Sequence, residues 1–195
     1  MNGRATRSQQ LPLEAGLTYS ERKRTTDGRP DIKGLYDRLD IIYFDGELAD
    51  AGYTITWGRQ MTLTSGCTDL TQREVRISWE IHRILPVEEL IGTLLHEMIH
   101  VKLFQHRQDR DSFHHTGAFL EEMDRINTMG PFRADIRHDL PRRVIRQLRP
   151  YVWRCRSRSY ILRLPNSRRP GPINVHLVEG EMVCENPLWV KVSIN

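Results

Sequence analysis

The segment LLHEMIHVKLF, residues 94–104, places two histidines four positions apart inside an almost wholly apolar stretch. Apolar side chains recur on nearly every side of the helix predicted over residues 86–105. A helix that is apolar all round is normally buried in the protein interior. His96, Glu97 and His100 therefore lie where ionisable side chains destabilise a fold unless a partner satisfies them. The chain must fold around this helix and supply that partner.

A metal ion is the partner that best fits this set of side chains. His96 and His100 lie one helical turn apart and can direct their ring nitrogens at one centre. Zn²⁺ accepts neutral imidazole ligands and keeps one position for water in catalytic sites. Glu97 is then placed as the general base that takes a proton from the zinc-bound water. The competing interpretation is two core histidines and a surface glutamate. It is disfavoured by the burial and by a second histidine pair downstream.

The third metal ligand stays open on local physics alone. The candidates are His106, His114, His115, Glu121 and Glu122. His106 lies six residues past His100, which rotates it away from the ligand face, so we expect it on the surface. A glutamate from the next predicted helix would complete a set of two histidines and one carboxylate. The histidine pair ends the loop just before that helix, from where it could also close the site.

The remaining apolar pattern indicates an α+β fold. Helical spacing predicts a helix over residues 32–43, with Gly46 as its stop. Short β-branched stretches predict strands of a small antiparallel sheet, with Gly58 and Gly66 at turns or bulges. These stretches are residues 53–57, 61–70 and 74–81. Further helices are predicted over residues 116–127 and 141–149, with β-rich segments from residue 151 onward.

Positive charge is concentrated late in the chain. Residues 133–170 hold twelve arginines, no lysine and two acids, a net charge of +10, whereas all other residues sum to −6. A merely solvated face would mix lysine, glutamate and arginine, while an all-arginine set suits bidentate contact with phosphate. The segment therefore predicts binding of a polyanion.

Two stretches of this segment offer side chains for nucleic acid. The predicted basic helix carries Arg142, Arg143, Arg146 and Arg149. In YVWRCRSRS, an extended chain would place Trp153 on one face and three arginines on the other, namely Arg154, Arg156 and Arg158. Phosphate attraction and base stacking on Trp153 are the ingredients of single-strand binding. The alternative for Trp153 is a place in a small core.

Five stretches, taken together, resemble the SprT-like zinc metalloproteases, most closely the Spartan group of DNA-dependent proteases in DNA–protein crosslink repair. They are LYDRLDIIYFDGEL, ITWGRQMTLTSG, LLHEMIHVKLF, HHTGAFLEEMDRIN and YVWRC, and they cover about residues 31–156. The family signature is an HExxH helix, a His-Gly-Pro-x-Phe type stretch and a helix ending in RIN. The HExxH motif matches His96, Glu97 and His100, and HTGAF matches the second motif. The resemblance thus implies His115 as the third ligand, with Thr116–Gly117 where Gly-Pro is usual.

The resemblance also implies a domain organisation. It implies a zincin-like metalloprotease domain, with helices packed on a small antiparallel sheet, over residues 30–140. Residues 1–29 lack apolar periodicity and are rich in polar residues, so we expect a disordered basic tail there. Residues 141–195 would form the basic helix and a DNA-binding β-ribbon that resembles a zinc ribbon. Such a ribbon normally offers four ligands, whereas this chain offers three, Cys155, His176 and Cys184. We therefore expect a metal-free ribbon, with a second structural zinc as the alternative.

Composition limits where such a protein would act. Three cysteines are too few for a disulfide framework and indicate a reducing compartment. No apolar run reaches the roughly 20 residues that a membrane helix needs, so we expect no membrane partner. The family and the basic cluster at residues 22–24 favour the nucleus and chromatin. The clamp-binding and ubiquitin-binding tail of Spartan-type proteins is not visible up to Asn195, so we expect no recruitment by those routes.

Three functional hypotheses follow. The first is a zinc endopeptidase that cleaves proteins crosslinked to or trapped on DNA, with DNA, single-stranded or carrying single-stranded features, as its activator. In it the zinc-bound water attacks the peptide carbonyl and Glu97 is the general base. The second is a DNA- or chromatin-binding module whose zinc site is structural or vestigial. The third is a zinc peptidase that is indifferent to nucleic acid.

Overall fold

The computed structural model describes seven stretches of the chain, residues 28–107, 114–136, 140–156, 161–171, 177–178, 181–182 and 188–193. The chain divides into two compact units. The first unit comprises residues 1–58, 66–77 and 86–136, and the second comprises residues 59–65, 78–85 and 137–195. The predicted domain boundaries at residues 29 and 140 stay a prediction.

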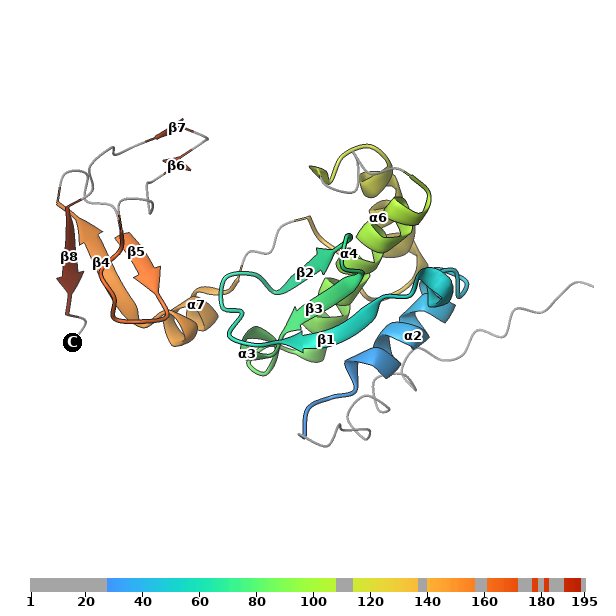
Figure 1. The fold of residues 1–195 in the computed structure, drawn as a ribbon, viewed down its shortest axis with the longest axis horizontal. Helices are drawn as coiled ribbons and strands as arrows, with labels where there is room; N and C mark the ends of the chain where they lie inside the picture. Colours follow the sequence, from blue (N-terminus) through green and yellow to red (C-terminus); the bar gives the residue numbers. More distant parts are fainter. Residues whose placement is uncertain are drawn as a thin grey trace, which may run out of the picture. The chain divides into compact units, whose positions relative to one another are not determined.

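The first unit contains helices and a small sheet, as an α+β fold requires (Figure 1). Its helices are α2 (Ile32–Tyr43), the short 3₁₀ helix η1 (Ala49–Ala51), α4 (Val87–Gln105) and α6 (Ala118–Met129). Its strands are β1 (Thr54–Gly58), β2 (Gly66–Asp69) and β3 (Glu74–Ser78), in the order β1-β3-β2. β2 pairs antiparallel with β3 and forms one edge of this sheet. α4 packs against both β2 and α6, which places the HExxH motif beside that edge.

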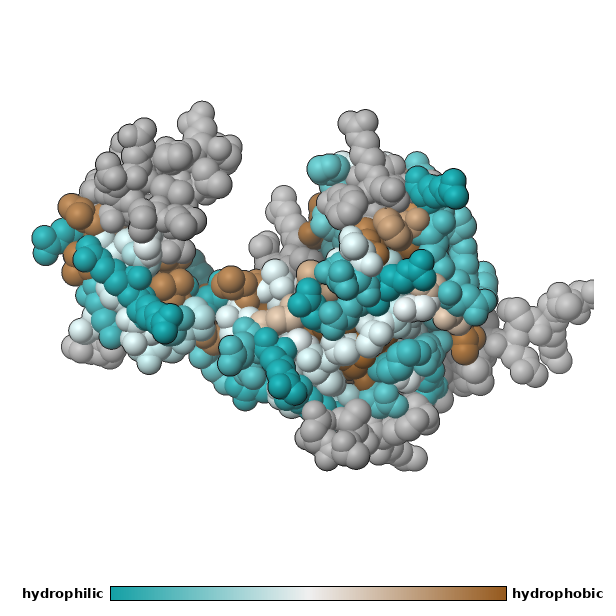
Figure 2. Space-filling model, viewed as in Figure 1, coloured by the Kyte–Doolittle hydropathy of each residue, from teal (hydrophilic) through white to brown (hydrophobic). Residues whose placement is uncertain are grey.

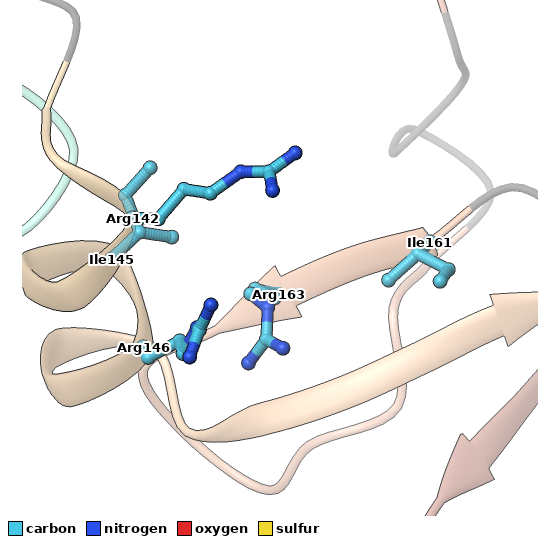
Figure 3. Close-up of a pocket in the computed structure, with 5 residues that line it drawn as sticks. All are labelled: Arg142, Ile145, Arg146, Ile161 and Arg163. Atoms are coloured by element: carbon cyan, nitrogen blue, oxygen red, sulfur yellow. The ribbon is translucent and has the colours of Figure 1, made fainter.

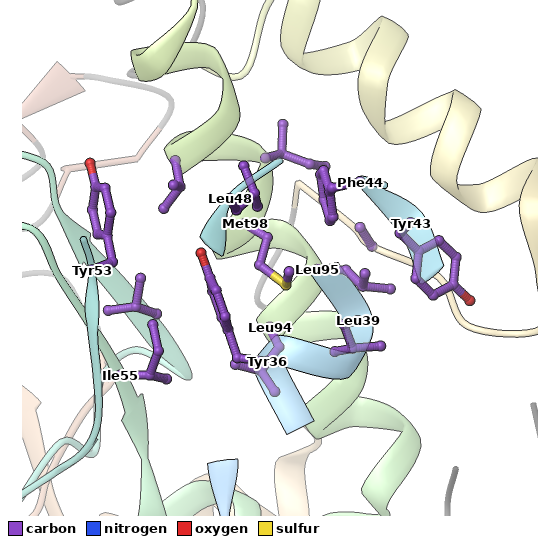
Figure 4. Close-up of a cluster of buried hydrophobic side chains, with 14 of the residues drawn as sticks. Tyr36, Leu39, Tyr43, Phe44, Leu48, Tyr53, Ile55, Leu94, Leu95 and Met98 are labelled. Carbon is purple, nitrogen blue, oxygen red and sulfur yellow. The ribbon is translucent and has the colours of Figure 1, made fainter. Parts of the chain in front are cut away.

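Helix α4 is central to the core of the first unit. Leu94, Leu95, Met98 and Ile99 have no exposed surface. α2 contributes the apolar stripe that its spacing predicted, including Tyr36, Leu39 and Tyr43 (Figure 4). The predictions of α2, α4 and α6 are confirmed, although α6 begins at residue 118 rather than 116.

Two of the three predicted strands were too long, whereas the first, predicted over residues 53–57, is confirmed with a shift of one residue. Only Gly66–Asp69 of the stretch 61–70 is a strand, and the third strand ends at Ser78. Residues Trp79–His82 form helix α3, because the Ser78 hydroxyl accepts a hydrogen bond from the Ile81 amide at 3.1 Å and so caps a helix. Gly66 is the first residue of β2 rather than part of a turn, and packing against α4 gives the physical reason for a glycine there.

The second unit combines α3 with α7 (Arg142–Leu148) and short strands. Strands β4 (Tyr151–Cys155), β5 (Ile161–Leu164) and β8 (Trp189–Val192) form an antiparallel sheet in the order β5-β4-β8. β6 (Leu177–Val178) pairs with β7 (Glu181–Met182). One small cluster of buried apolar residues joins Ile81 of α3 to Val144 and Leu148 of α7, and a second joins Trp153, Cys155 and Trp189.

Among the described residues, none of the helices is both long and apolar enough to cross a bilayer. On the face drawn in Figure 2, the hydrophobic residues are scattered rather than gathered into one large patch. Scattered exposed apolar side chains are ordinary for a folded protein.

Candidate active site

Three histidines meet at one point in the first unit. His96 and His100 come from α4, and His115 comes from the segment that leads into α6. The Nε2–Nε2 distance is 3.1 Å between His96 and His100, 3.0 Å between His96 and His115, and 3.1 Å between His100 and His115. An Nε2 atom of a neutral imidazole either donates or accepts, so three mutual contacts cannot all be hydrogen bonds. One ion at about 2.0–2.1 Å from each nitrogen accounts for this separation.

The contact made by Nδ1 of His96 determines the tautomer of its ring. Nδ1 of His96 lies 2.7 Å from the backbone carbonyl oxygen of Asp135. A carbonyl oxygen only accepts, so Nδ1 carries the proton and Nε2 presents its lone pair to the other two rings. A hydrogen bond from the far nitrogen to a carbonyl is the usual support of a metal-binding histidine. The donor set therefore fits a metal ion.

An aromatic ring supports the three imidazoles from α6. Phe119 is fully buried, and its ring centroid lies 5.1, 4.9 and 4.6 Å from those of His96, His100 and His115. His115 has a φ of 52°, which is rare for a residue with a side chain, and Gly117 has a φ of 48°. The chain thus makes a tight reversal between the third histidine and the helix that carries Phe119. Strain of this kind is commonly stored at functional sites.

Glu97, the residue that follows His96 on α4, is only 3% exposed. Its Oε2 atom accepts a hydrogen bond of 2.6 Å from the Thr68 hydroxyl on β2. Burial raises the pKa of the Glu97 carboxyl to about 7, and the hydrogen bond from Thr68 partly opposes that rise by lowering it. A carboxyl with a pKa near 7 can both accept and release a proton at neutral pH, as a general base and acid must.

The other candidates for the third ligand lie elsewhere. His106 pairs with Glu47 on the surface, and His114 and Glu121 are exposed. Glu122 accepts hydrogen bonds from Arg125 and Lys102. Burial would raise the pKa of Glu122, but these two cations outweigh that effect and lower it. Within the described part of the chain, the one group of three metal-ligating side chains comprises His96, His100 and His115.

Several residues of the site could not have been found from local patterns. Thr68 and Glu97 are 29 positions apart, and Asp135 and His96 are 39 positions apart. Phe119 lies in the helix predicted over residues 116–127, where no local pattern distinguishes it as a neighbour of the histidines. The one usable signal was Gly66 inside a β-branched stretch, because glycine in a strand often marks a close approach of another group.

The second unit has an arginine-lined cavity of about 370 Å³ between α7 and β5. It is lined by Arg142, Ile145 and Arg146 of α7 and by Ile161 and Arg163 of β5 (Figure 3). Figure 3 shows Arg146 and Arg163 side by side, so guanidinium groups from two different elements converge there. The sequence had not singled out Arg163, since only the pairing of β4 with β5 brings it beside Arg142 and Arg146.

The other predicted nucleic-acid contacts have different surroundings. Arg143, Arg154 and Arg156 are exposed. The structure gives Arg149 another role, because its guanidinium donates to the carbonyl oxygens of Thr62 and Leu63 at 2.6 to 3.3 Å. Trp153, only 7% exposed, packs with Cys155 and Trp189, which is the core alternative rather than a stacking platform. Arg158, His176 and Cys184 lie outside the described residues.

Two histidines and a carboxylate on a buried helix, joined by a third histidine from the segment before α6, form the kind of site that metal-dependent hydrolases use. Residues 32–138 match the SprT-like family. The chain belongs to the SprT-like family.

Curated relatives agree with this assignment. The chain is 32% identical over 135 residues to the DNA-dependent metalloprotease SPRTN of Danio rerio, covering 67% of this chain and 21% of that protein. It is 32% identical over 200 residues to SPRTN of Bos taurus, covering 90% of this chain and 40% of that protein. It is 33% identical over 162 residues to the DNA-dependent metalloprotease dvc-1 of Caenorhabditis elegans, covering 75% of this chain and 43% of that protein. The chain thus spans less than half the length of these relatives.

The raised pKa of Glu97 predicts a pH-dependent gain in stability from Glu97→Gln. Folding raises the pKa of the Glu97 carboxyl from about 4.5 to about 7. The free energy of unfolding is therefore greatest below pH 4.5, where Glu97 is protonated in both the folded and the unfolded chain. That advantage is lost as the pH rises through 7, at a cost of about 3 kcal/mol once Glu97 is ionised. In chelator-treated protein, Glu97→Gln should melt several degrees above wild type at pH 8 and at a similar temperature at pH 5. Exposed Glu121→Gln is the control, and equal melting of Glu97→Gln and wild type at pH 8 would contradict the burial argument.

Proposed function

We propose that this chain is a zinc endopeptidase of a zincin-like fold that cleaves proteins crosslinked to or trapped on DNA. The observation that carries the proposal is the convergence of three Nε2 atoms beside a buried glutamate. His96, His100 and His115 would hold the ion. When bound, Zn²⁺ lowers the pKa of a water ligand and polarises the scissile carbonyl.

Glu97 would act as general base and then as general acid in the hydrolysis. It accepts a proton from the attacking water and can pass it to the leaving amine, since its pKa of about 7 suits both directions. Nδ1 of His96, bonded to the Asp135 carbonyl, holds that ring in one tautomer and orientation. Glu97 is thus the catalytic residue, and the three histidines are ligands.

Strand β2 is the candidate surface for the substrate backbone. It is the edge of the three-stranded sheet and lies beside α4, and Thr68 within it contacts Glu97. An extended peptide can add to such an edge through main-chain hydrogen bonds, which gives affinity with little dependence on side chains. Such binding suits a protease that must accept many different proteins.

The arginine-lined cavity supports DNA as the partner. Guanidinium groups of Arg142, Arg146 and Arg163 can hold phosphates, while Ile145 and Ile161 offer apolar contact to an unpaired base. Exposed Arg143, Arg154 and Arg156 extend the positive surface of the second unit. We propose single-stranded DNA, or DNA with single-stranded features, as the activator. The relatives' designation as DNA-dependent metalloproteases supports this partner, and with it a place on chromatin in the nucleus.

Proteolysis with and without DNA tests the function. We expect wild type to cleave histones and itself when single-stranded DNA is present, and the salt dependence should be steep because phosphate contacts release counterions. Glu97→Gln should lose at least about a thousandfold in rate while still binding DNA. Equal rates for Glu97→Gln and wild type would refute the mechanism. DNA binding without proteolysis under any condition would instead favour a DNA-binding module, and turnover insensitive to DNA would favour a peptidase indifferent to nucleic acid.

Substitutions in the second unit should separate DNA-contacting arginines from structural ones. The double variant Arg142→Gln/Arg146→Gln should bind single-stranded DNA more weakly, with the slope of log affinity against log salt reduced by about 1 to 2. Arg149→Gln should lower the melting temperature instead, because Thr62 and Leu63 lose their hydrogen-bond donor. The exposed pair Arg168→Gln/Arg169→Gln, outside the cavity, is the matched control for the loss of two charges. An unchanged slope in the double variant would contradict the assignment.

A further inference from the structure

We propose that Thr68 is a positioning residue for Glu97 and that the inner face of β2 is shaped around that carboxylate. This inference rests on the proposed function, because it assigns Glu97 the role of general base. It concerns the side chains of β2 that face α4, which neither the HExxH motif nor the histidine triad includes.

The hydrogen bond from Thr68 fixes the glutamate side chain. The Thr68 hydroxyl donates to Oε2 of Glu97 at 2.6 Å, a short distance typical of a bond to a charged acceptor, and lies 3.4 Å from the Glu97 backbone oxygen. With Oε2 held, rotation of the carboxyl group is restricted and Oε1 is the oxygen left to take the proton. A base held in one orientation avoids an entropic cost in the transition state.

Gly66 makes room for the same carboxylate. Residues 66 and 68 lie on one face of β2, since side chains alternate along a strand, and Cys67 between them is exposed. A Cβ atom at residue 66 would lie 2.6 Å from Oε1 of Glu97 and 2.8 Å from Cγ2 of Thr93. Only a glycine allows β2 to approach α4 this closely. Gly66 and Thr68 thus confine both carboxylate oxygens from the same strand.

Thr68→Val tests the positioning role, since valine keeps the shape of the side chain and removes only the hydroxyl. We expect kcat to fall about 10- to 100-fold, a typical loss when an outer partner of a catalytic group is removed. KM should change less than about twofold, because the hydroxyl that is removed bonds Glu97, whereas the substrate is proposed to bind the main chain of β2. Thr68→Ser, which restores the hydroxyl, should recover most of the lost rate. Zinc content and melting temperature should stay near wild type.

The chain offers a matched control on the same sheet. Thr56 of β1 donates to Oε1 of Glu74 at 3.0 Å, so Thr56→Val removes a threonine–glutamate hydrogen bond away from the site. We expect Thr56→Val to leave kcat unchanged. The role of Thr68 is overturned by an unchanged kcat in Thr68→Val, by a loss that lies wholly in KM, by failure of Thr68→Ser to recover the rate, or by an equal loss in Thr56→Val.

A second pair of variants tests the space around the carboxylate. Gly66→Ala should lower kcat at least as much as Thr68→Val, because the added methyl group must displace Glu97. Gly171→Ala is the control, since no atom of the described residues lies within 4 Å of a Cβ atom there. Wild-type kcat in Gly66→Ala would overturn this part of the inference. Hydrolysis that persists in Glu97→Gln refutes the proposed function itself, whereas a dead Glu97→Gln beside a fully active Thr68→Val refutes only the role of Thr68. A wild type that hydrolyses nothing refutes both.

Discussion

Burial of helix α4 is the constraint on which the first unit depends. Its apolar residues build the core, and the same helix carries His96 and Glu97 into the interior, each at most 3% exposed. Their polar atoms must therefore be satisfied by groups from other parts of the chain. The carbonyl of Asp135 meets His96, and the hydroxyl of Thr68 meets Glu97. The fold and the site are thus two consequences of burying one helix.

The sequence correctly predicts those elements whose apolar residues repeat because one face is buried. The spacing of apolar residues located α2, α4 and α6, because a helix that buries one face must repeat its apolar side chains. The strand predictions overran because a β-branched stretch does not show where a hydroxyl, here that of Ser78, caps a helix. In the site, the spacing of His96 and His100 was sufficient, and the family resemblance pointed to His115. Thr68 and Gly66 needed the structure, since only the packing of β2 on α4 brings them to Glu97.

The second unit shows why charge alone does not define a binding surface. Arg149 directly follows α7, and its guanidinium donates hydrogen bonds to backbone carbonyl oxygens, so it stabilises the unit. Arg146, less than one turn earlier, lines the cavity with Arg163 from β5. Both belong to the same arginine-rich segment, and the count of +10 treats them alike. Position on the helix and the register of β5 with β4 decide which arginines remain available to a phosphate.

The zinc content of the purified chain shows whether His96, His100 and His115 hold a metal ion. We predict at least one zinc per wild-type chain by elemental analysis, and the loss of one equivalent in the double variant His96→Ala/His100→Ala. Cys155→Ser should leave this equivalent in place, because Cys155 lies in the core of the second unit. A wild-type chain without zinc, or a double variant with undiminished zinc, would contradict the proposal that these histidines hold the metal.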